Sequence, residues 1–247
     1  MVNKPGRRKK KEGHGQAYLA IGVIIILVAA STAYAYVAGL GPFSKGQSSI
    51  GTTTCVTTTR SSVSANSTTP SVLYARFNTT LGSFDVELFY SLAPDTVANF
   101  VSLVDQGFYN GLVWHRIVPG FVIQTGDPTT RDGGGQRDTW GESGSCTYIP
   151  FEYAPSLHND EYYLGMASTG AGVGGSSQFY INLANNTSGS GNLDGKYAVF
   201  GKVINGTSVV QALGNVLVES VNLIGGATQS EPVMPVYVIS IKMISGP

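Results

Sequence analysis

Charged residues are scarce in this 247-residue chain, since Lys, Arg, Asp and Glu together supply only 12% of it. That share is about half of what soluble proteins usually carry, and it excludes a heptad coiled coil and a disordered acidic or basic chain, which both depend on dense charge. Residues 41–247 contain only two histidines, His115 and His158, and two cysteines, too few for a convincing zinc cluster. No Gly-x-Ser-x-Gly sequence occurs, so the nucleophile elbow of the α/β-hydrolases is absent as well.

The residues that are abundant favour a turn-rich β protein. Hydrophobic residues make up 42% of the chain, which also contains 32 Gly and 11 Pro, a composition that suits short strands and turns better than a helical bundle. The formal net charge is zero, but residues 1–12 carry a surplus of five positive charges and the rest of the chain five negative ones. Because the body is acidic, we expect no binding to nucleic acid, which requires clustered cations.

Residues 17–40 form an uncharged stretch that follows six cations. As a helix rising about 1.5 Å per residue, it exceeds the roughly 30 Å hydrocarbon core of a bilayer. We therefore predict a transmembrane helix over residues 17–40 and, because basic flanks stay inside, a cytoplasmic tail over residues 1–16. The protein is then a single-pass cell-membrane protein whose body lies outside the cytoplasm. The alternative is a secreted form, cleaved as a signal peptide near the small residues of Ala33-Tyr34-Ala35.

Residues 41–71 are predicted to be a flexible stalk. Gly41-Pro42 ends the apolar helix, and Ser, Thr and Gly dominate the segment, which leaves too little apolar surface to offset the entropy of ordering. Cys55 lies in this stalk and Cys146 in the body. Two cysteines in an exported chain suggest one disulfide bond between them, although free thiols or a bond between chains are alternatives.

Residues 72–247 carry the pattern of one β domain. Segments typical of strands are Leu73–Phe77, Gly82–Leu88, Leu112–Ile117, Phe121–Thr125, Tyr163–Ala167, Phe179–Leu183, Ala198–Val203 and Val236–Ile244. Helical spacing predicts one helix from Pro94 that ends at Gly107, and a second over Ser208–Leu213. We therefore predict a mainly β fold, a closed eight-stranded antiparallel barrel capped by two α-helices and preceded by the N-terminal transmembrane helix.

Four runs of sequence carry the strongest functional signal. The longest, Trp114–Asp127, reads Trp-His-Arg-Ile-Val-Pro-Gly-Phe-Val-Ile-Gln-Thr-Gly-Asp, and Leu164–Ala167, Ser176–Ile181 and Leu193–Val203 follow in order. In these runs the chain resembles the cyclophilin family of peptidyl-prolyl cis–trans isomerases. The resemblance covers about Leu73 to Ile244, and it implies an eight-stranded barrel capped by two helices, in agreement with the strand pattern.

The chemistry of that family needs few groups. Rotation about an amide bond has a barrier of about 18–20 kcal/mol, and a catalyst must favour the twisted state, in which the proline nitrogen can accept a hydrogen bond. A permanently charged arginine suits this task. The resemblance implies that the catalytic residues are Arg116, Phe121, which lines the proline pocket, and Gln124, which orients substrate and arginine. It implies no nucleophile, no metal and no cofactor.

The same resemblance assigns further residues to substrate binding. Val122, Tyr180, Leu193 and Tyr197 match positions that line the proline pocket, and Ala167, Ser168 and Gln178 match the adjoining groove. Several positions depart from the commonest family pattern: valine replaces methionine at 122, tyrosine replaces phenylalanine at 180 and histidine at 197, and Asn192 stands where many members have tryptophan. Because that tryptophan is tied to cyclosporin binding in the family, we expect weak cyclosporin binding.

Two classes of function follow from these residues. The first is a peptidyl-prolyl cis–trans isomerase (EC 5.2.1.8) that accelerates X–Pro rotation during the folding of exported proteins, with Pro-containing unfolded or flexible polypeptides as partners. The second is a cyclophilin-like binding or scaffold module that recognises Pro-containing segments without useful catalysis. The joint presence of Arg116, Phe121 and Gln124 favours the enzyme, because a module that only binds has no need of that arginine.

Overall fold

The computed structural model describes residues 72–247. The cytoplasmic tail, the transmembrane helix and the stalk that the sequence predicts fall within residues 1–71, outside the described residues. Neither of the α-helices in residues 72–247 combines the length and the apolar character that a bilayer span needs.

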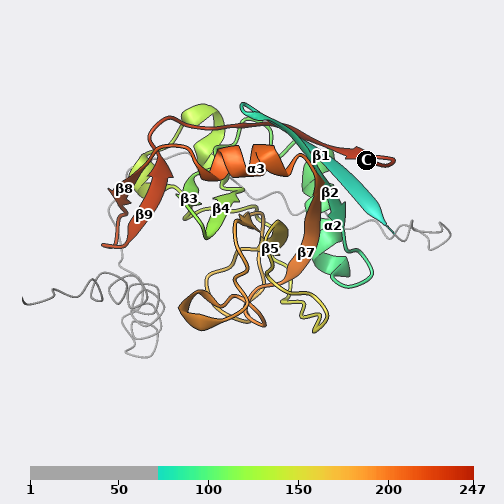
Figure 1. Ribbon diagram of the computed structural model, residues 1–247. Helices are drawn as coiled ribbons and strands as arrows, with labels where there is room; N and C mark the ends of the chain where they lie inside the picture. The colour runs from blue at the N-terminus through green and yellow to red at the C-terminus, as the bar shows by residue number, and fades with distance from the viewer. Residues whose placement is uncertain (1–71) are drawn as a thin grey trace, which may run out of the picture. The chain divides into compact units, whose positions relative to one another are not determined.

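Ten strands and two α-helices form the described part of the chain, with three short 3-10 helices in its loops (Figure 1). The strands are β1 (Leu73–Thr79), β2 (Gly82–Leu88), β3 (Arg116–Val118), β4 (Val122–Thr125), β5 (Tyr163–Met166), β6 (Phe179–Asn182), β7 (Val199–Asn205), β8 (Val218–Asn222), β9 (Thr228–Pro232) and β10 (Val238–Ile244). The helices are α2 (Pro94–Asp105), α3 (Thr207–Gly214), η1 (Pro128–Gly133), η2 (Arg137–Thr139) and η3 (Gly189–Gly191).

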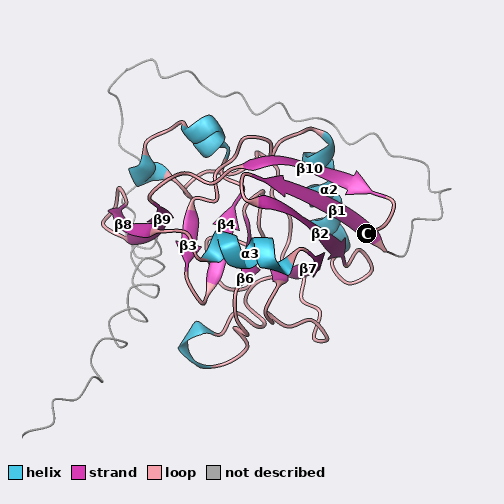
Figure 2. Cartoon of the chain, turned by 45° about the horizontal axis from the view of Figure 1, so that its top comes forward, coloured by secondary structure: helices cyan, strands magenta, loops and turns pink. Residues whose placement is uncertain are grey.

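Eight strands form one antiparallel sheet in the order β10-β1-β2-β7-β5-β6-β4-β3 (Figure 2). The sheet curls, so that the segments ahead of its edge strands β3 and β10 meet. There, Val113 forms an isolated antiparallel bridge with Tyr237, and the Trp114 N–H donates to the Val236 carbonyl at 2.9 Å. The predicted mainly β fold is confirmed as a curled eight-stranded antiparallel sheet. The full closure of the predicted barrel is not, because in residues 72–247 the two edges meet at an isolated bridge rather than along a continuous ladder.

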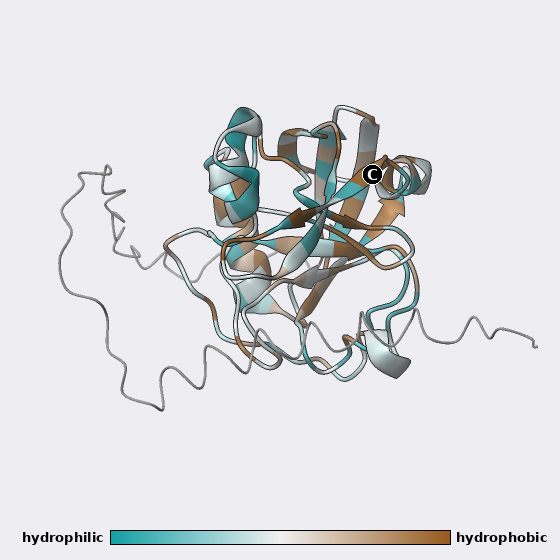
Figure 3. Ribbon diagram, turned by 90° about the vertical axis from the view of Figure 1, so that its left-hand side faces the viewer, coloured by the Kyte–Doolittle hydropathy of each residue, from teal (hydrophilic) through white to brown (hydrophobic). Residues whose placement is uncertain are grey.

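An aromatic core fills the inside of the curled sheet. Phe77, Phe84, Phe100, Phe179 and Phe200 are each at most 1% exposed. The rings of Phe100, from α2, and Phe179, from β6, meet edge-to-face with centroids 5.6 Å apart, a geometry that aromatic pairs prefer. Figure 3 shows the apolar residues concentrated in the strands. This core packs against one face of the strands, so that side chains on the opposite face lie outside the core.

The two helices begin at positions that the sequence marks. Pro94 fixes the backbone of the first turn of α2, and the Glu152 carboxylate accepts the N–H groups of Asp95 and Thr96 at 3.0 and 2.7 Å. Gly206 precedes α3 with a φ of 77°, which suits glycine. In space α2 contacts β10, and α3 contacts β2, β3 and β4.

All eight predicted strands are present, and both helices are confirmed within two residues of their predicted ends. The largest difference concerns Leu112–Ile117, of which only the last two residues belong to a strand. Ahead of them, the Leu112 carbonyl accepts the N–H of Val238, the first residue of β10, and the Trp114 N–H donates to the Val236 carbonyl. The hairpin of β8 and β9 was not predicted. Its second strand, Thr228–Pro232, reads Thr-Gln-Ser-Glu-Pro and lacks the apolar alternation that signals a strand.

Candidate active site

Residues from four strands form a transverse row on one face of the sheet. The register pairs Arg116 with Gln124, Gln124 with Tyr180, and Tyr180 with Gly165, across β3, β4, β6 and β5. Side chains alternate between the two faces along a strand, and Ile123, next to Gln124, belongs to the core. The row therefore lies on the face opposite the core.

Arg116 is held by contacts with two other predicted catalytic residues. Its Nη1 donates to Gln124 Oε1 at 3.2 Å, and its Cζ lies 5.9 Å from the centroid of the Phe121 ring. Gln124 Nε2 donates in turn to Gln178 Oε1 at 2.8 Å. A guanidinium has five N–H donors, so the bond to Gln124 leaves most of them for a ligand.

Burial sets the charge states of Arg116 and its neighbour His115. Desolvation lowers the pKa of Arg116 from its usual value, and Tyr197 and Tyr180 oppose that shift. An arginine still keeps its charge at neutral pH. Burial lowers the pKa of His115 to about 4, and neither of its ring nitrogens makes a hydrogen bond of normal geometry in residues 72–247. His115 is therefore neutral, and Arg116 supplies the positive charge of the row.

The backbone of Phe121 is fixed by the loop that follows β6. The Phe121 carbonyl accepts the N–H of Leu183 at 2.8 Å and Nδ2 of Asn186 at 3.0 Å. The Asn186 carbonyl accepts the N–H of Leu193 at 2.8 Å. One buried asparagine thus ties the predicted binding residue Leu193 to the turn that carries Phe121.

Tyr180 is 4% exposed, and its hydroxyl has a partner. Tyr180 Oη donates to Asn159 Oδ1 at 2.7 Å, and Asn159 donates through its backbone N and Nδ2 to Asp194 Oδ1 at 2.6 and 3.2 Å. The ring of Tyr197 stands edge-on to that of Tyr180, with centroids 6.0 Å apart. Burial raises the pKa of Tyr180 well above its usual range, so its hydroxyl stays protonated and acts as a donor.

The Tyr180 ring lies directly across Gly165. A Cβ at position 165 would come within 2.2 Å of Cζ and Oη of Tyr180, so the ring can occupy this place only above a glycine. We expect Gly165→Ala to destabilise the domain by about 1–3 kcal/mol, because overpacking forces side chains off their preferred rotamers. Urea unfolding measures this. In a Tyr180→Ala background the same change should cost less than about 0.5 kcal/mol, and a single variant as stable as the parent would contradict the packing.

The remaining predicted binding residues lie beside the row. Val122, the first residue of β4, is 1% exposed. Ala167 follows β5 and donates its N–H to the Gln178 carbonyl at 2.9 Å, while Ser168 Oγ donates to the Gly170 carbonyl at 2.7 Å. The structure therefore brings the predicted catalytic and binding residues together on β3, β4 and β6 and on the loops next to them.

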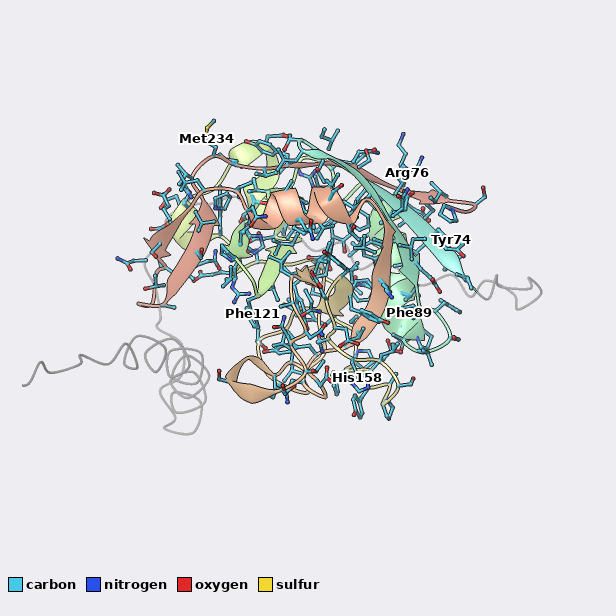
Figure 4. All side chains as sticks on the ribbon, in the orientation of Figure 1. Tyr74, Arg76, Phe89, Phe121, His158 and Met234 are labelled. Atoms are coloured by element: carbon cyan, nitrogen blue, oxygen red, sulfur yellow. The ribbon has the colours of Figure 1, made fainter. Side chains whose placement is uncertain are left out.

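Sequence reasoning missed the polar residues that support the row. Asn159 is fully buried, yet in the sequence it is one polar residue among several in a loop. Asp194 lies inside the matched run Leu193–Val203, and that position was the signal that could have found it. Figure 4 shows Phe121 and His158, the neighbour of Asn159, on the same side of the domain and away from Arg76.

The predicted disulfide bond stays a prediction, because Cys55 lies outside the described residues. Cys146 lies in the loop between η2 and β5 and is exposed. In residues 72–247 no group of three or more His, Cys, Asp or Glu side chains is arranged to hold a metal ion.

Comparison with known proteins relates this arrangement to one family. A family model described as cyclophilin type peptidyl-prolyl cis-trans isomerase/CLD matches residues 74–243. Peptidyl-prolyl cis-trans isomerase-like 1 of Aspergillus fumigatus is 38% identical over 169 residues, which are 68% of this chain and 93% of that protein. A peptidyl-prolyl cis-trans isomerase of Acinetobacter baylyi is 38% identical over 168 residues, or 68% of this chain and 83% of that protein.

Solved structures show the same likeness. A cyclophilin type peptidyl-prolyl cis-trans isomerase of Cryptosporidium parvum superposes with a TM-score of 0.57 and 29% identity, over 71% of this chain and 99% of that one. A crystal structure of the same protein in the presence of the dipeptide Ala-Pro gives a TM-score of 0.56, also at 29% identity, over 70% of this chain and 99% of that one.

Proposed function

Because this chain belongs to the family of cyclophilin-type peptidyl-prolyl cis-trans isomerases, we propose that its isomerase activity depends on the row of residues around Arg116. The observation that carries the proposal is the geometry of that arginine. It is joined to Gln124, lies near the Phe121 ring and keeps donors available. Arg116, Phe121 and Gln124 are the proposed catalytic residues.

The reaction needs only selective binding of the twisted amide. As an X–Pro bond twists it loses resonance, and the proline nitrogen gains a localised lone pair. A guanidinium N–H of Arg116 donates to that nitrogen, and this hydrogen bond is stronger in the twisted state than in either planar isomer. A contact that favours the transition state over the ground state lowers the barrier. Gln124 keeps the guanidinium in the direction that the nitrogen requires.

Substrate recognition divides between ring and backbone contacts. We propose that the proline ring packs on apolar groups of Phe121, Val122, Tyr180, Leu193 and Tyr197, and that Ala167, Ser168 and Gln178 bind the flanking peptide backbone. The presence of Ala-Pro with the Cryptosporidium parvum relative supports a Pro-containing peptide as the ligand. Tyr180 presents little polar character to such a ligand, because its hydroxyl is bonded to Asn159.

A protease-coupled isomerisation assay with the full chain tests this assignment. The protease cleaves only the trans form of an X–Pro peptide, so the enzyme should accelerate the slow cleavage phase. Calorimetric titration with an uncleavable Pro-containing peptide should show binding in the parent. If alanine at Arg116, Phe121 or Gln124 abolishes neither acceleration nor binding, the row is not the active site. Binding without any acceleration in the parent would favour the scaffold function instead.

We also propose that the isomerase domain, residues 72–247, is held outside the cytoplasm by a helix at residues 17–40 and a stalk at residues 41–71, where it would serve exported proteins. The cations before residue 17 and the uncharged stretch after it support this orientation. Protease added to intact cells should degrade the domain and leave residues 1–16 protected. The reverse pattern would overturn the orientation, and a soluble product beginning near Tyr36 would replace the anchor with a cleaved signal peptide.

A further inference from the structure

Two side-chain amides link Arg116 to a loop that reaches the site from η2. Gln178 Nε2 donates to the carbonyls of Gly141 and Ser143 at 2.9 and 2.6 Å. Gln178 Oε1 accepts from Gln124 Nε2 at 2.8 Å, and Gln124 Oε1 accepts from Arg116 Nη1 at 3.2 Å. We call Gln124 and Gln178 the amide relay.

The orientation of both amides is decided at the loop end of the relay. A carbonyl oxygen only accepts, so the amide that faces two carbonyls must turn its NH2 group toward them, and Gln178 Oε1 then faces Gln124. Gln124 presents its NH2 group to that oxygen and its own oxygen to Arg116, which only donates. If the Gln178 amide were flipped, its oxygen would face the carbonyl oxygens of Gly141 and Ser143, and its NH2 group would face the NH2 group of Gln124. Neither contact can form a hydrogen bond. The direction of the Gln124 oxygen therefore depends on the two loop carbonyls.

Asp127 holds these two carbonyls in place. Its side chain is fully buried, and Oδ2 accepts the N–H groups of Gly141 and Ser143 at 2.6 and 3.3 Å. Oδ1 accepts the N–H and the hydroxyl of Thr129 at 2.8 and 2.7 Å. Because both oxygens face donors, an asparagine of the same size would set its NH2 group against donors in either orientation.

We propose that Asp127 is a positioning residue of the isomerase: through Gly141 and Ser143 it orients the amide relay, and through the relay it directs the guanidinium of Arg116. Asp127 acts at a distance and does not touch the substrate. The inference rests on the proposed function, in which Arg116 is the catalytic donor.

The test compares Asp127→Asn with a matched control in the full chain. Asp127→Asn should lower kcat/KM about tenfold, mainly through kcat, with KM within about twofold of the parent. The control is Asp85→Asn. Asp85 is 1% exposed and accepts two bonds from Arg76 at 2.7 and 2.9 Å, but three strands separate β2 from β4 in the sheet. Asp85→Asn should keep kcat/KM within about twofold of the parent.

A double-mutant cycle separates positioning from a general loss of structure. If Asp127 acts through the relay, Asp127→Asn should have little further effect in a Gln124→Ala background, because the contact it directs is already gone. A tenfold loss that persists in that background would overturn the inference, and so would equal effects of Asp127→Asn and Asp85→Asn.

A second variant keeps the inference testable if Asp127→Asn does not fold. Gln178→Glu retains an acceptor for Gln124 but cannot donate to the carbonyls of Gly141 and Ser143, so kcat should fall. Unchanged kcat in that variant would overturn the inference. An Arg116→Ala variant assayed beside them separates the two proposals. Parental activity of Arg116→Ala overturns the proposed function. An inactive Arg116→Ala beside parental activity of Asp127→Asn and Gln178→Glu overturns the inference alone.

Discussion

Arg116→Ala is expected to lower kcat/KM about 100- to 1000-fold, the loss that follows removal of one fixed donor from a transition-state site. The substitution removes the only guanidinium of the row and leaves Gln124 Oε1 without its partner. The domain should stay folded, because the row lies opposite the core that Phe100 and Phe179 form. The protease-coupled assay gives the rate, and circular dichroism gives the fold.

Two further variants make this expectation specific. Arg116→Lys keeps the charge but not the rigid fork that donates to Gln124 and the substrate together, so it should restore little activity. Lys242→Ala removes an exposed cation from β10, where Lys242 pairs with Arg76 of β1, and should leave kcat/KM unchanged. Activity of Arg116→Ala within about tenfold of the parent, with an unchanged spectrum, would refute the catalytic assignment.

Cyclosporin is expected to inhibit this isomerase roughly 30- to 150-fold more weakly than relatives with tryptophan at the position of Asn192, because an aromatic contact and one hydrogen bond are lost. The Asn192 side chain is also engaged within its own turn. Its Oδ1 accepts the N–H of Asp194 at 2.9 Å, and the backbone carbonyl of Asn192 accepts a hydrogen bond from Lys196 Nζ at 2.7 Å. It therefore offers the drug little apolar area.

Titration of cyclosporin against the parent and Asn192→Trp measures this effect. The new indole should strengthen inhibition on the order of tenfold. This is less than the full difference, because the hydrogen bond that the Asp194 N–H donates to Asn192 Oδ1 costs about 1 kcal/mol to lose. Ser190→Trp is the matched control, since Ser190 is exposed in the same loop, and it should not change inhibition. Equal inhibition of the parent and Asn192→Trp would show that position 192 is not the determinant.

The local sequence pattern predicts most of the strands and helices, but it says little about how the sheet closes. Alternation in Leu73–Phe77 and Gly82–Leu88 predicts strands because each residue already shows which face it prefers. The seam could not be predicted in this way, because Val113 and Tyr237 are far apart in the chain and a bridge between them leaves no periodic signal in either segment. The hairpin of β8 and β9 was missed for a related reason. Most of β8 is exposed, and the buried residues of β9 are Glu231 and Pro232, so neither strand has the apolar alternation of a half-buried strand.

The candidate site divides in the same way. The sequence by itself determined that the chain carries Arg116, Phe121 and Gln124 in one run, because a short motif records residue type and local spacing. Only the tertiary structure decided that Tyr180 and Gly165 complete the row. It also decided that Asn159 accepts a hydrogen bond from the Tyr180 hydroxyl and that Asp127 anchors the amide relay. Strand register and buried hydrogen bonds join residues from distant segments, and burial turns an ordinary Asp or Asn into a group whose every donor and acceptor must find a partner.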